Sequence, residues 1–421
     1  MKIFFDTVGC RLNQAEIEHW AAQFRSQGHE IVSNAADADW VIVNTCSVTA
    51  AAASDSREKI RDASRAGSKK IIVTGCWSEM EPDQAQTLEN VVRIVPNAEK
   101  DGMASLLLGI KPEDFDLEPL KREPLPGIHA RTRAFIKVQD GCDNHCTFCV
   151  THIVRGKSRS IPQKEILKEV QLAERSGGNE VVLTGVNLGA WGLDFEKPEN
   201  LADLLAFLLK ESGIPRIRLS SLESWNLSPQ FVELWDNPRL CRHFHLPLQS
   251  GSETVLKRMA RRTTLPEFRQ IVAEARRIDP DFAVTTDVIV GFPGETDAEF
   301  QQTLDFVREI GFSGGHVFVY SPRPGTAAPK LGTAVRSAVA KERSRILREV
   351  FSESRDAFYR RAVGKKTEVL WESSLPPQNG LWEVHGLTGN YLSVRMLSDR
   401  RIYNVIQSIT PKSYDGQFLS T

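Results

Sequence analysis

Three cysteines in the first part of the chain each follow directly on a predicted β-strand: Cys10, Cys46 and Cys76. Predicted strands and helices alternate in this region, with strands expected at 2–8, 40–44 and 70–74 and helices at 14–27 and 50–66. Such alternation favours a parallel sheet, whose strands all end along one edge. Although 35 and 29 residues separate consecutive cysteines, we expect all three to meet at that edge.

The alternation of strands and helices resumes near residue 135 and predicts a second, larger α/β unit. Six strands are expected in it, at 135–138, 180–184, 217–220, 244–247, 283–290 and 315–319. Six β/α units fit an open or partial (β/α) barrel better than a complete barrel of eight.

After a charged amphipathic helix at 341–361, the pattern changes to short alternating strands. They are expected at 366–372, 381–386, 391–396 and 405–410, and they predict a small all-β barrel. The expected fold class is therefore α/β. Its expected segments are a parallel-sheet domain at 1–110, a linker at 111–130, a partial barrel at 131–362 and a β-barrel at 363–421.

The loop after the first barrel strand carries a C-x3-C-x2-C motif, formed by Cys142, Cys146 and Cys149. Three thiolates on one loop can ligate three irons of a four-iron cluster and leave the fourth iron open to a substrate. A structural zinc site needs a fourth Cys or His, and His145 and His152 are the candidates, but neither gives a familiar spacing. The motif therefore favours an iron–sulfur cluster.

The three strand-end cysteines repeat this three-ligand pattern on a second domain. Taken one by one, each would be interpreted as a small buried hydrophobic residue. Taken together, they predict a second cluster with an open iron, since a closed electron relay ordinarily has four protein ligands. Cys241 precedes a buried strand and is expected to be structural.

Composition limits the location and the partners. The 53 Lys and Arg against 54 Asp and Glu give a net charge of −1, so a polyanion would bind at local basic patches. No run approaches the roughly 20 apolar residues of a membrane span, and Asp6 interrupts any signal peptide. Seven cysteines, an odd number, argue against a disulfide framework. We expect a cytoplasmic protein with no membrane partner.

The cluster loop resembles that of radical S-adenosylmethionine (SAM) enzymes, in which the open iron binds SAM and the cluster delivers the electron that cleaves it. The resemblance implies that Phe148 packs near the adenine of SAM. Thr184, Gly185 and Asn187 follow the second strand, where this superfamily often has a Gly-Gly-Glu motif, and the glutamate is missing here. The other residues expected at the SAM site lie at the ends of further strands: Ser221, Glu223, Gln249, Val290 and Gly291.

The complete chain resembles the methylthiotransferases, in which a three-cysteine domain, a radical SAM domain and a small TRAM β-barrel follow one another. The segment from Gly9 to Glu16, Gly-Cys-Arg-Leu-Asn-Gln-Ala-Glu, is most similar to the MtaB-type signature Gly-Cys-Lys-Val-Asn-Gln-x-Glu. This resemblance implies methylthiolation of C2 of N6-threonylcarbamoyladenosine at position 37 of tRNA. N6-isopentenyladenosine in tRNA, an aspartate of a ribosomal protein, and a non-catalytic iron–sulfur RNA-binding protein remain alternatives.

The resemblance also implies two 4Fe-4S clusters, SAM, a sulfur donor and an electron donor such as flavodoxin or ferredoxin. The RNA partner would be the tRNA anticodon loop, whose bases are already single-stranded. Basic residues near the cluster loop and after Gln249 are expected to neutralise phosphates: Arg131, Arg133, Lys137, Arg155, Lys157, Arg159, Lys257, Arg258, Arg261 and Arg262. Tyr391 and Tyr403 are candidates for stacking on bases.

Overall fold

A computed structural model describes residues 1–111, 115, 125–126 and 132–421. Its first part is a parallel sheet of five strands in the spatial order β2 (Glu30–Ile31), β1 (Lys2–Thr7), β3 (Trp40–Thr45), β4 (Ile71–Gly75) and β5 (Val91–Val95). The three expected strands are confirmed as β1, β3 and β4. The expected linker lies almost entirely outside the described residues.

Helices cover both faces of this sheet, since its strands are apolar on both sides. They are α1 (Arg11–Ser26), α2 (Ala50–Arg65), α3 (Cys76–Met80), α4 (Pro82–Gln86) and α5 (Met103–Leu108), with short 3-10 turns at Ala35–Asp37 and Lys100–Gly102. Trp20 of α1 packs with Ile3 in one core. Ile60 of α2 and Trp77 of α3 pack with Val43 in another.

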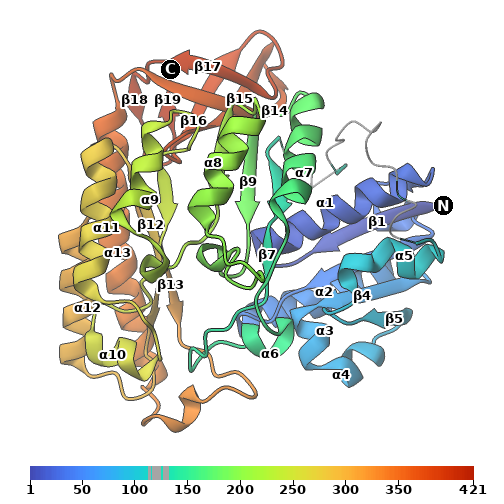
Figure 1. Cartoon of the computed structure of the whole chain (residues 1–421), viewed down its shortest axis with the longest axis horizontal. Coiled ribbons are helices and arrows are strands. Elements are labelled where there is room, and N and C mark those ends of the chain that lie inside the picture. Colours follow the sequence, from blue (N-terminus) through green and yellow to red (C-terminus); the bar gives the residue numbers. More distant parts are fainter. Residues whose placement is uncertain (112–114, 116–124, 127–131) are drawn as a thin grey trace.

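The second part is an open barrel of six parallel strands, as the sequence predicts. In spatial order they are β6 (Ala134–Lys137), β9 (Glu180–Thr184), β10 (Arg216–Leu219), β11 (His243–His245), β12 (Ala283–Val290) and β13 (Gly314–Val319). Two parallel bridges, Ile217 to Leu240 and Ser221 to His245, connect the β10 side of the barrel to the β11 side. Figure 1 shows the N-terminal sheet beside this barrel.

Helices form the outer layer of the barrel: α7 (Gln163–Arg175), α8 (Leu201–Glu211), α9 (Pro229–Glu233), α10 (Glu253–Arg258), α11 (Leu265–Ile278), α12 (Asp297–Ile310) and α13 (Ser337–Ala362). Short 3-10 turns lie at Leu188–Ala190, Ser224–Asn226, Leu234–Asp236 and Ala328–Lys330. Phe244, Val284 and Val317 alternate with polar residues on their strands and pack in the same core as Phe268 of α11. The strand neighbours of these three residues, which include His243, His245, Thr285 and His316, therefore face the interior of the barrel.

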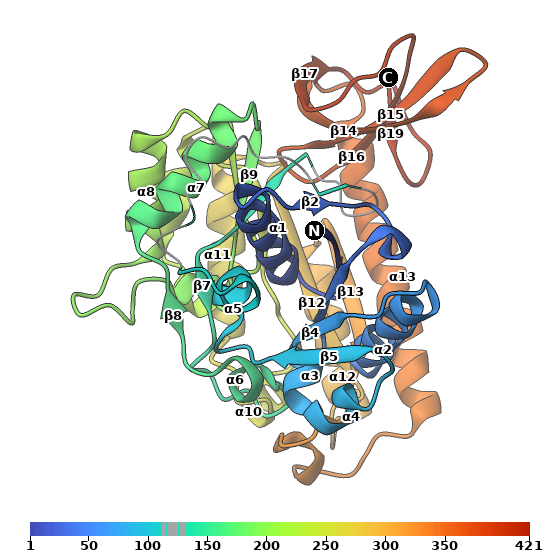
Figure 2. The ribbon, with the colours of Figure 1, turned by 90° about the vertical axis from the view of Figure 1, so that its right-hand side faces the viewer.

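The C-terminal part is a mixed sheet of six strands, in agreement with the expected small all-β unit. Its spatial order is β17 (Val405–Ile409), β14 (Thr367–Gln378), β15 (Leu381–Thr388), β16 (Ser393–Ser398), β19 (Leu419–Ser420) and β18 (Ser413–Tyr414). The two shortest strands, β18 and β19, were not expected. Figure 2 shows this sheet at one end of α13, near the N-terminal sheet.

Two buried arginines fasten the C-terminal sheet to the barrel. Arg218 of β10 donates to the carbonyl oxygens of Thr388 and Gly389, each at 3.1 Å, and pairs with Glu180 at 2.7 Å. Arg216 donates to the Glu368 carbonyl at 3.0 Å. Among the described helices, none has both the length and the apolar character required to cross a membrane.

Candidate functional site

The barrel cysteines lie on a loop that a short two-stranded ladder holds in place. The ladder pairs β7 (Gln139–Asp140) with β8 (Arg159–Ser160), and helix α6 (Thr151–Arg155) lies between them in sequence. Gly141 has a φ of +71°, and a Cβ there would overlap the carbonyl oxygen of Lys157. The Cys142 amide donates to the Gly156 carbonyl at 3.0 Å. The loop is therefore tightly closed at its base.

Gln139 connects this loop to the end of β9. Its amide nitrogen donates to the Gly141 carbonyl at 2.7 Å and to Ser158 Oγ at 2.9 Å. Its carbonyl oxygen accepts from the Asn187 amide at 2.9 Å. A Cβ on Gly185 would lie 2.8 Å from the same oxygen, so glycine is required there for packing. Gln139 was not predicted as a site residue, and its burial is not visible in the sequence.

Arg261 approaches the same loop from the far side of the barrel. It forms two hydrogen bonds with Glu223, at 3.1 and 2.5 Å, and its Nη1 lies 3.9 Å from Cys146 Sγ. Its side chain is 4% exposed and lies over the ring of Trp225. The expectation that Arg261 neutralises phosphates is therefore wrong, because its charge is buried and paired with a carboxylate.

The strand-end cysteines meet at the edge of the N-terminal sheet, as expected from a parallel arrangement. Cys10 precedes α1, Cys46 follows β3 and Cys76 opens α3. Gly9 has a φ of +104°, and a Cβ there would lie 2.6 Å from Cys46 Sγ. Burial, and then the neighbouring thiols, raise the pKa of Cys46 to about 12. The three thiols thus lie within electrostatic reach of one another.

Arg155 of α6, the short helix that follows the barrel cysteines, contacts the N-terminal triad. Its Nε lies 3.3 Å from Cys76 Sγ, and its Nη2 donates to Asn13 Oδ1 at 2.7 Å. Its Nη1 contacts Glu16 at 3.2 Å and Asp140 at 2.9 Å. Burial opposes ionisation of Glu16, but Lys100, Arg155 and Lys137 together lower the pKa of this carboxyl to about 2. A buried cluster of opposite charges therefore connects α1 to the barrel loop.

Several basic residues near the loop are consequently not available for phosphates. Arg155 is 3% exposed, Lys137 pairs with Asp101, Arg133 pairs with Glu372 at 2.6 Å and Arg258 pairs with Glu299 at 2.8 Å. These expectations are wrong because each charge already has a carboxylate partner. The exposed members of the set are Lys157, Arg159, Lys257 and Arg262, while Arg131 lies outside the described residues.

The other residues expected at the SAM site surround the barrel loop. Phe148 packs edge-on to Phe292 with centroids 6.5 Å apart, and Thr184 is buried at the end of β9. Ser221 bridges to His245, and Asn187 Oδ1 accepts from Asn226 at 3.2 Å.

Gln249, Val290 and Gly291 lie at or next to the end of β12. Gln249 has a φ of +67° and pairs with Val288, and Val290 is fully buried. The Gly291 amide donates to Glu295 at 2.7 Å, and a Cβ on Gly291 would lie 2.7 Å from Ala340 Cβ. Packing against α13 thus accounts for this glycine.

Cys241 was expected to be structural, and Tyr391 was expected to stack on RNA bases. Cys241 is buried, with its Sγ 3.8 Å from Glu180 Oε2, which agrees with a structural role. Tyr391 stacks on His243 at 4.4 Å between the barrel and the C-terminal sheet. The expectation that Tyr391 stacks on RNA bases is therefore wrong, whereas Tyr403 is exposed.

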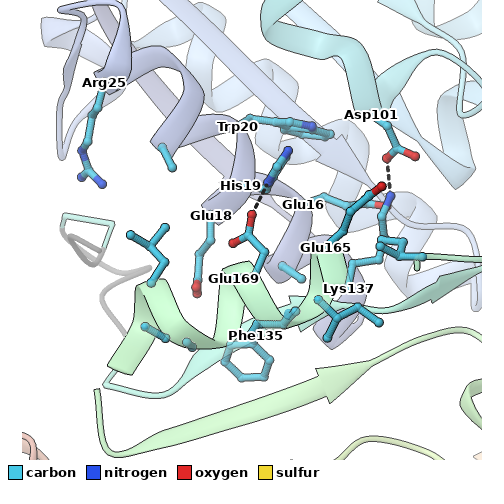
Figure 3. A pocket seen from close by; sticks show the side chains of 18 of the residues that line it. Glu16, Glu18, His19, Trp20, Arg25, Asp101, Phe135, Lys137, Glu165 and Glu169 are labelled. Atoms are coloured by element: carbon cyan, nitrogen blue, oxygen red, sulfur yellow. Dashed lines mark hydrogen bonds and ion pairs between the residues drawn. The ribbon is translucent and has the colours of Figure 1, made fainter. Parts of the chain in front are cut away.

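A cavity of about 710 Å³ lies between α1 and the β6–α7 side of the barrel. Figure 3 shows His19 of α1 facing Glu169 of α7, and their Nδ1 and Oε1 atoms are 3.5 Å apart. None of the cysteines lines this cavity, and of the buried charge cluster only Glu16 and Lys137 do. The cavity is thus separate from the cysteine site.

Each cysteine triad offers three thiols to a cluster. Burial, and weakly the other two loop thiols, raise the pKa of Cys142, to about 11, so a cluster would have to displace its proton. Within the described part of the chain, no three His, Cys, Asp or Glu side chains are arranged to hold one metal ion. A four-iron cluster instead distributes its thiolates over separate irons.

Comparisons with known proteins support this architecture. Residues 136–307 match the family model of the Radical SAM superfamily, and residues 2–96 match that of Uncharacterized protein family UPF0004. The solved structure of the radical SAM methyltransferase TsrM from Kitasatospora setae with cobalamin and a 4Fe-4S cluster has a TM-score of 0.56 at 12% identity, covering 78% of this chain and 73% of that one. The barrel and its three-cysteine loop thus define a radical SAM enzyme.

Curated relatives identify the family. The threonylcarbamoyladenosine tRNA methylthiotransferase MtaB of Thermotoga maritima is 38% identical over 376 residues, covering 87% of this chain and 86% of the relative. MtaB of Aquifex aeolicus is 36% identical over 412 residues, covering 94% and 96%. The chain belongs to the MtaB family of methylthiotransferases. Membership in the radical SAM superfamily implies a 4Fe-4S cluster and SAM as cofactors.

Proposed function

We propose that this protein transfers a methylthio group to C2 of N6-threonylcarbamoyladenosine at position 37 of tRNA. The observation that carries the proposal is that Arg155, at the end of the helix that follows Cys149, lies with its Nε 3.3 Å from Cys76 Sγ of the other triad. The names of the MtaB relatives support the same substrate. The two groups of thiols would thus serve two tasks, cleavage of SAM and supply of the transferred sulfur.

In this proposal, Cys142, Cys146 and Cys149 hold the SAM-binding cluster, and Cys10, Cys46 and Cys76 hold a second 4Fe-4S cluster. When bound, the first would supply the electron that cleaves SAM to a radical, and the second would carry the sulfur that is methylated and transferred. The residues assigned to SAM binding are Phe148, Thr184, Gly185, Asn187, Ser221, Glu223, Gln249, Val290 and Gly291.

The chain's own side chains would hold these thiols in place. Arg261 places a cation 3.9 Å from Cys146 Sγ and is itself oriented by Glu223. Arg155 does the same for Cys76 and is oriented by Asn13, Glu16 and Asp140. Cations beside thiols favour the thiolate form that a cluster requires.

The proposal assigns a task to each segment of the chain. Residues 1–110 would carry the second cluster, 111–130 would link it to the barrel, 131–362 would bind SAM, and 363–421 would contribute to tRNA binding. The exposed cations Lys157, Arg159, Lys257 and Arg262 would contact phosphates of the anticodon arm, which makes binding salt-dependent. We propose a cytoplasmic location, a low-potential electron donor such as flavodoxin or ferredoxin, and a separate sulfur donor.

The test is anaerobic reconstitution with iron and sulfide, followed by reaction with SAM, a reductant and tRNA that carries N6-threonylcarbamoyladenosine. Mass spectrometry of the digested nucleosides should show the 2-methylthio product, and 5′-deoxyadenosine should form with it. Cys146→Ala should abolish both products, whereas Cys46→Ala should abolish the nucleoside product and retain 5′-deoxyadenosine. Cys241→Ala is the matched control, since this cysteine lies in neither triad.

Each other outcome contradicts part of the proposal. Product only with N6-isopentenyladenosine tRNA would replace the substrate, and a mass shift of a ribosomal protein would replace the class of substrate. No 5′-deoxyadenosine from the loaded wild-type protein would favour a binding protein. Loss of 5′-deoxyadenosine in both cysteine variants would contradict the division of labour between the triads.

A further inference from the structure

Arg11 follows Cys10 directly and is the first residue of α1. Its Nη2 donates to the hydroxyl of Tyr391 at 2.8 Å, and its guanidinium lies 5.6 Å from the centroid of that ring. Tyr391 in turn stacks on His243, with ring centroids 4.4 Å apart and planes at 15°. Through Tyr391, Arg11 thus connects the residue beside Cys10 to His243, the first residue of β11.

This position faces the interior of the barrel. His243 and His245 alternate with the core residue Phe244, and both contact Thr285 Oγ1, at 2.9 and 3.0 Å. Because Phe244 points to the helical layer, the two histidines point the other way. Arg11 therefore lies on the concave side of the barrel, next to the triad that would carry the sulfur.

The neighbouring arginines all have a carboxylate partner. Arg133 pairs with Glu372 at 2.6 Å, Arg218 with Glu180 at 2.7 Å, and Arg216 with both Glu180 and Glu368 at 3.8 Å. Asp287, the carboxylate on this face, is already bound by His245 and His316. Among the residues that the structure describes, no carboxylate pairs with Arg11.

A partly buried cation without a counter-ion is unfavourable. A second cation is close by, because the Arg218 guanidinium lies 5.0 Å from the centroid of the same Tyr391 ring. An anionic ligand would relieve both effects, because it supplies a negative charge and accepts the remaining guanidinium hydrogens. The site is therefore suited to a small anion and not to an apolar group.

We propose that Arg11 binds the carboxylate of the threonylcarbamoyl group on the target adenosine. This inference rests on the proposed function, because it requires that the base enter the barrel with C2 directed at the triad of Cys10. C2 and N6 lie on the same edge of adenine, on either side of N1, so a substituent on N6 would extend past the residue beside Cys10. A guanidinium can bind a carboxylate with two parallel hydrogen bonds. The isopentenyl group offers it no acceptor.

The test compares three anticodon stem-loop RNAs that differ only at position 37: N6-threonylcarbamoyladenosine, N6-isopentenyladenosine and adenosine. Fluorescence anisotropy with the reconstituted protein measures their Kd values. In Arg11→Gln, affinity for the threonylcarbamoyl RNA should fall about 10-fold to 100-fold, as for a lost charged hydrogen bond in a buried site. Affinity for the other two RNAs should not change, and Arg11→Lys should recover part of the loss.

Arg308→Gln is the matched control, since Arg308 is an exposed residue of α12 whose ion-pair partner is Asp305 of the same helix. An equal loss for all three RNAs would overturn the inference and assign Arg11 to general RNA binding or folding. No loss for the threonylcarbamoyl RNA would overturn it as well. Failure of the proposed function has a different signature, because wild-type protein would then leave the threonylcarbamoyl RNA unmethylthiolated whatever the behaviour of Arg11→Gln.

Discussion

Arg155 has a different environment in the fold from the one its sequence neighbours suggest. In the sequence it stands with Lys157 and Arg159 after the cluster loop, where a phosphate contact is the natural interpretation. In the fold its side chain is 3% exposed and contacts Glu16, Asp140 and the Cys76 thiol. Its charge therefore pairs with buried carboxylates and lies beside the Cys76 thiol instead of facing solvent.

We predict that Arg155→Met weakens cluster binding by the N-terminal triad about 10-fold to 100-fold, the usual cost of losing a residue that orients a metal ligand. The measurement is iron bound per chain in a background with Cys142, Cys146 and Cys149 replaced by alanine. Arg155→Lys should retain more iron because it keeps the charge beside Cys76. Equal iron in the methionine variant and its parent would refute a role for Arg155 toward this triad.

At the scale of elements, the cluster loop depends on a turn that only glycine can form. Gly141 has a φ of +71°, and any Cβ there meets the backbone of Lys157, the residue that leads into β8. Backbone cannot move aside as a flexible side chain can. The pairing of β7 with β8 and the position of Cys142 therefore depend on this residue.

A side chain at Gly141 has two costs: backbone strain at positive φ and overlap with the backbone of Lys157. Comparison with Gly67 separates them. Gly67 has a φ of +94° but nothing within 4 Å of a Cβ, so Gly67→Ala should cost about 1–2 kcal/mol of unfolding free energy from backbone strain alone. Gly141→Ala should cost clearly more and should lose the iron of the barrel triad. Thermal unfolding and iron content check both variants. Similar stabilities would show that the β7–β8 ladder tolerates the overlap.

At the scale of the whole molecule, the C-terminal sheet depends on arginines of the barrel. Arg218 is completely buried, pairs with Glu180 and donates to two carbonyls of the turn after β15. Asn179 at the start of β9 adds a hydrogen bond to Asn404 at 2.8 Å. The C-terminal sheet is thereby held at the end of the barrel where β9, β10 and β11 begin.

We predict that Arg218→Met destabilises the protein by about 3–5 kcal/mol, because it leaves Glu180 buried without its main partner. Adding Glu180→Gln should restore part of that loss, since the uncompensated charge is then gone. Thermal melting measures stability, and limited proteolysis near residue 363 reports release of the C-terminal sheet. Arg277→Met, which removes an exposed pair with Glu274, should change little. A double variant no better than the single one would contradict the buried-charge argument.

The fold was largely predictable because hydrophobic periodicity is local. β3, β4 and β9 contain continuous apolar runs, other barrel strands alternate apolar with polar residues, and the β/α alternation leaves few topologies. The strands that were not expected are short or partly exposed: β2, β5, β7, β8, β18 and β19, with Arg93 in the middle of β5. The hydrophobic periodicity of such short segments is too weak to distinguish them from loops.

The architecture and the two groups of three cysteines could be predicted from the sequence alone, because strand ends and ligand spacing are properties of short segments. Which charges are buried and paired could not be predicted in this way, because it depends on the fold. Arg155, Arg258 and Arg261 find their carboxylates on other elements, whereas Arg11 finds none among the described residues. Coulomb interactions depend on distance in space, and the fold alone brings Glu16, Asp140 and Cys76 to one guanidinium.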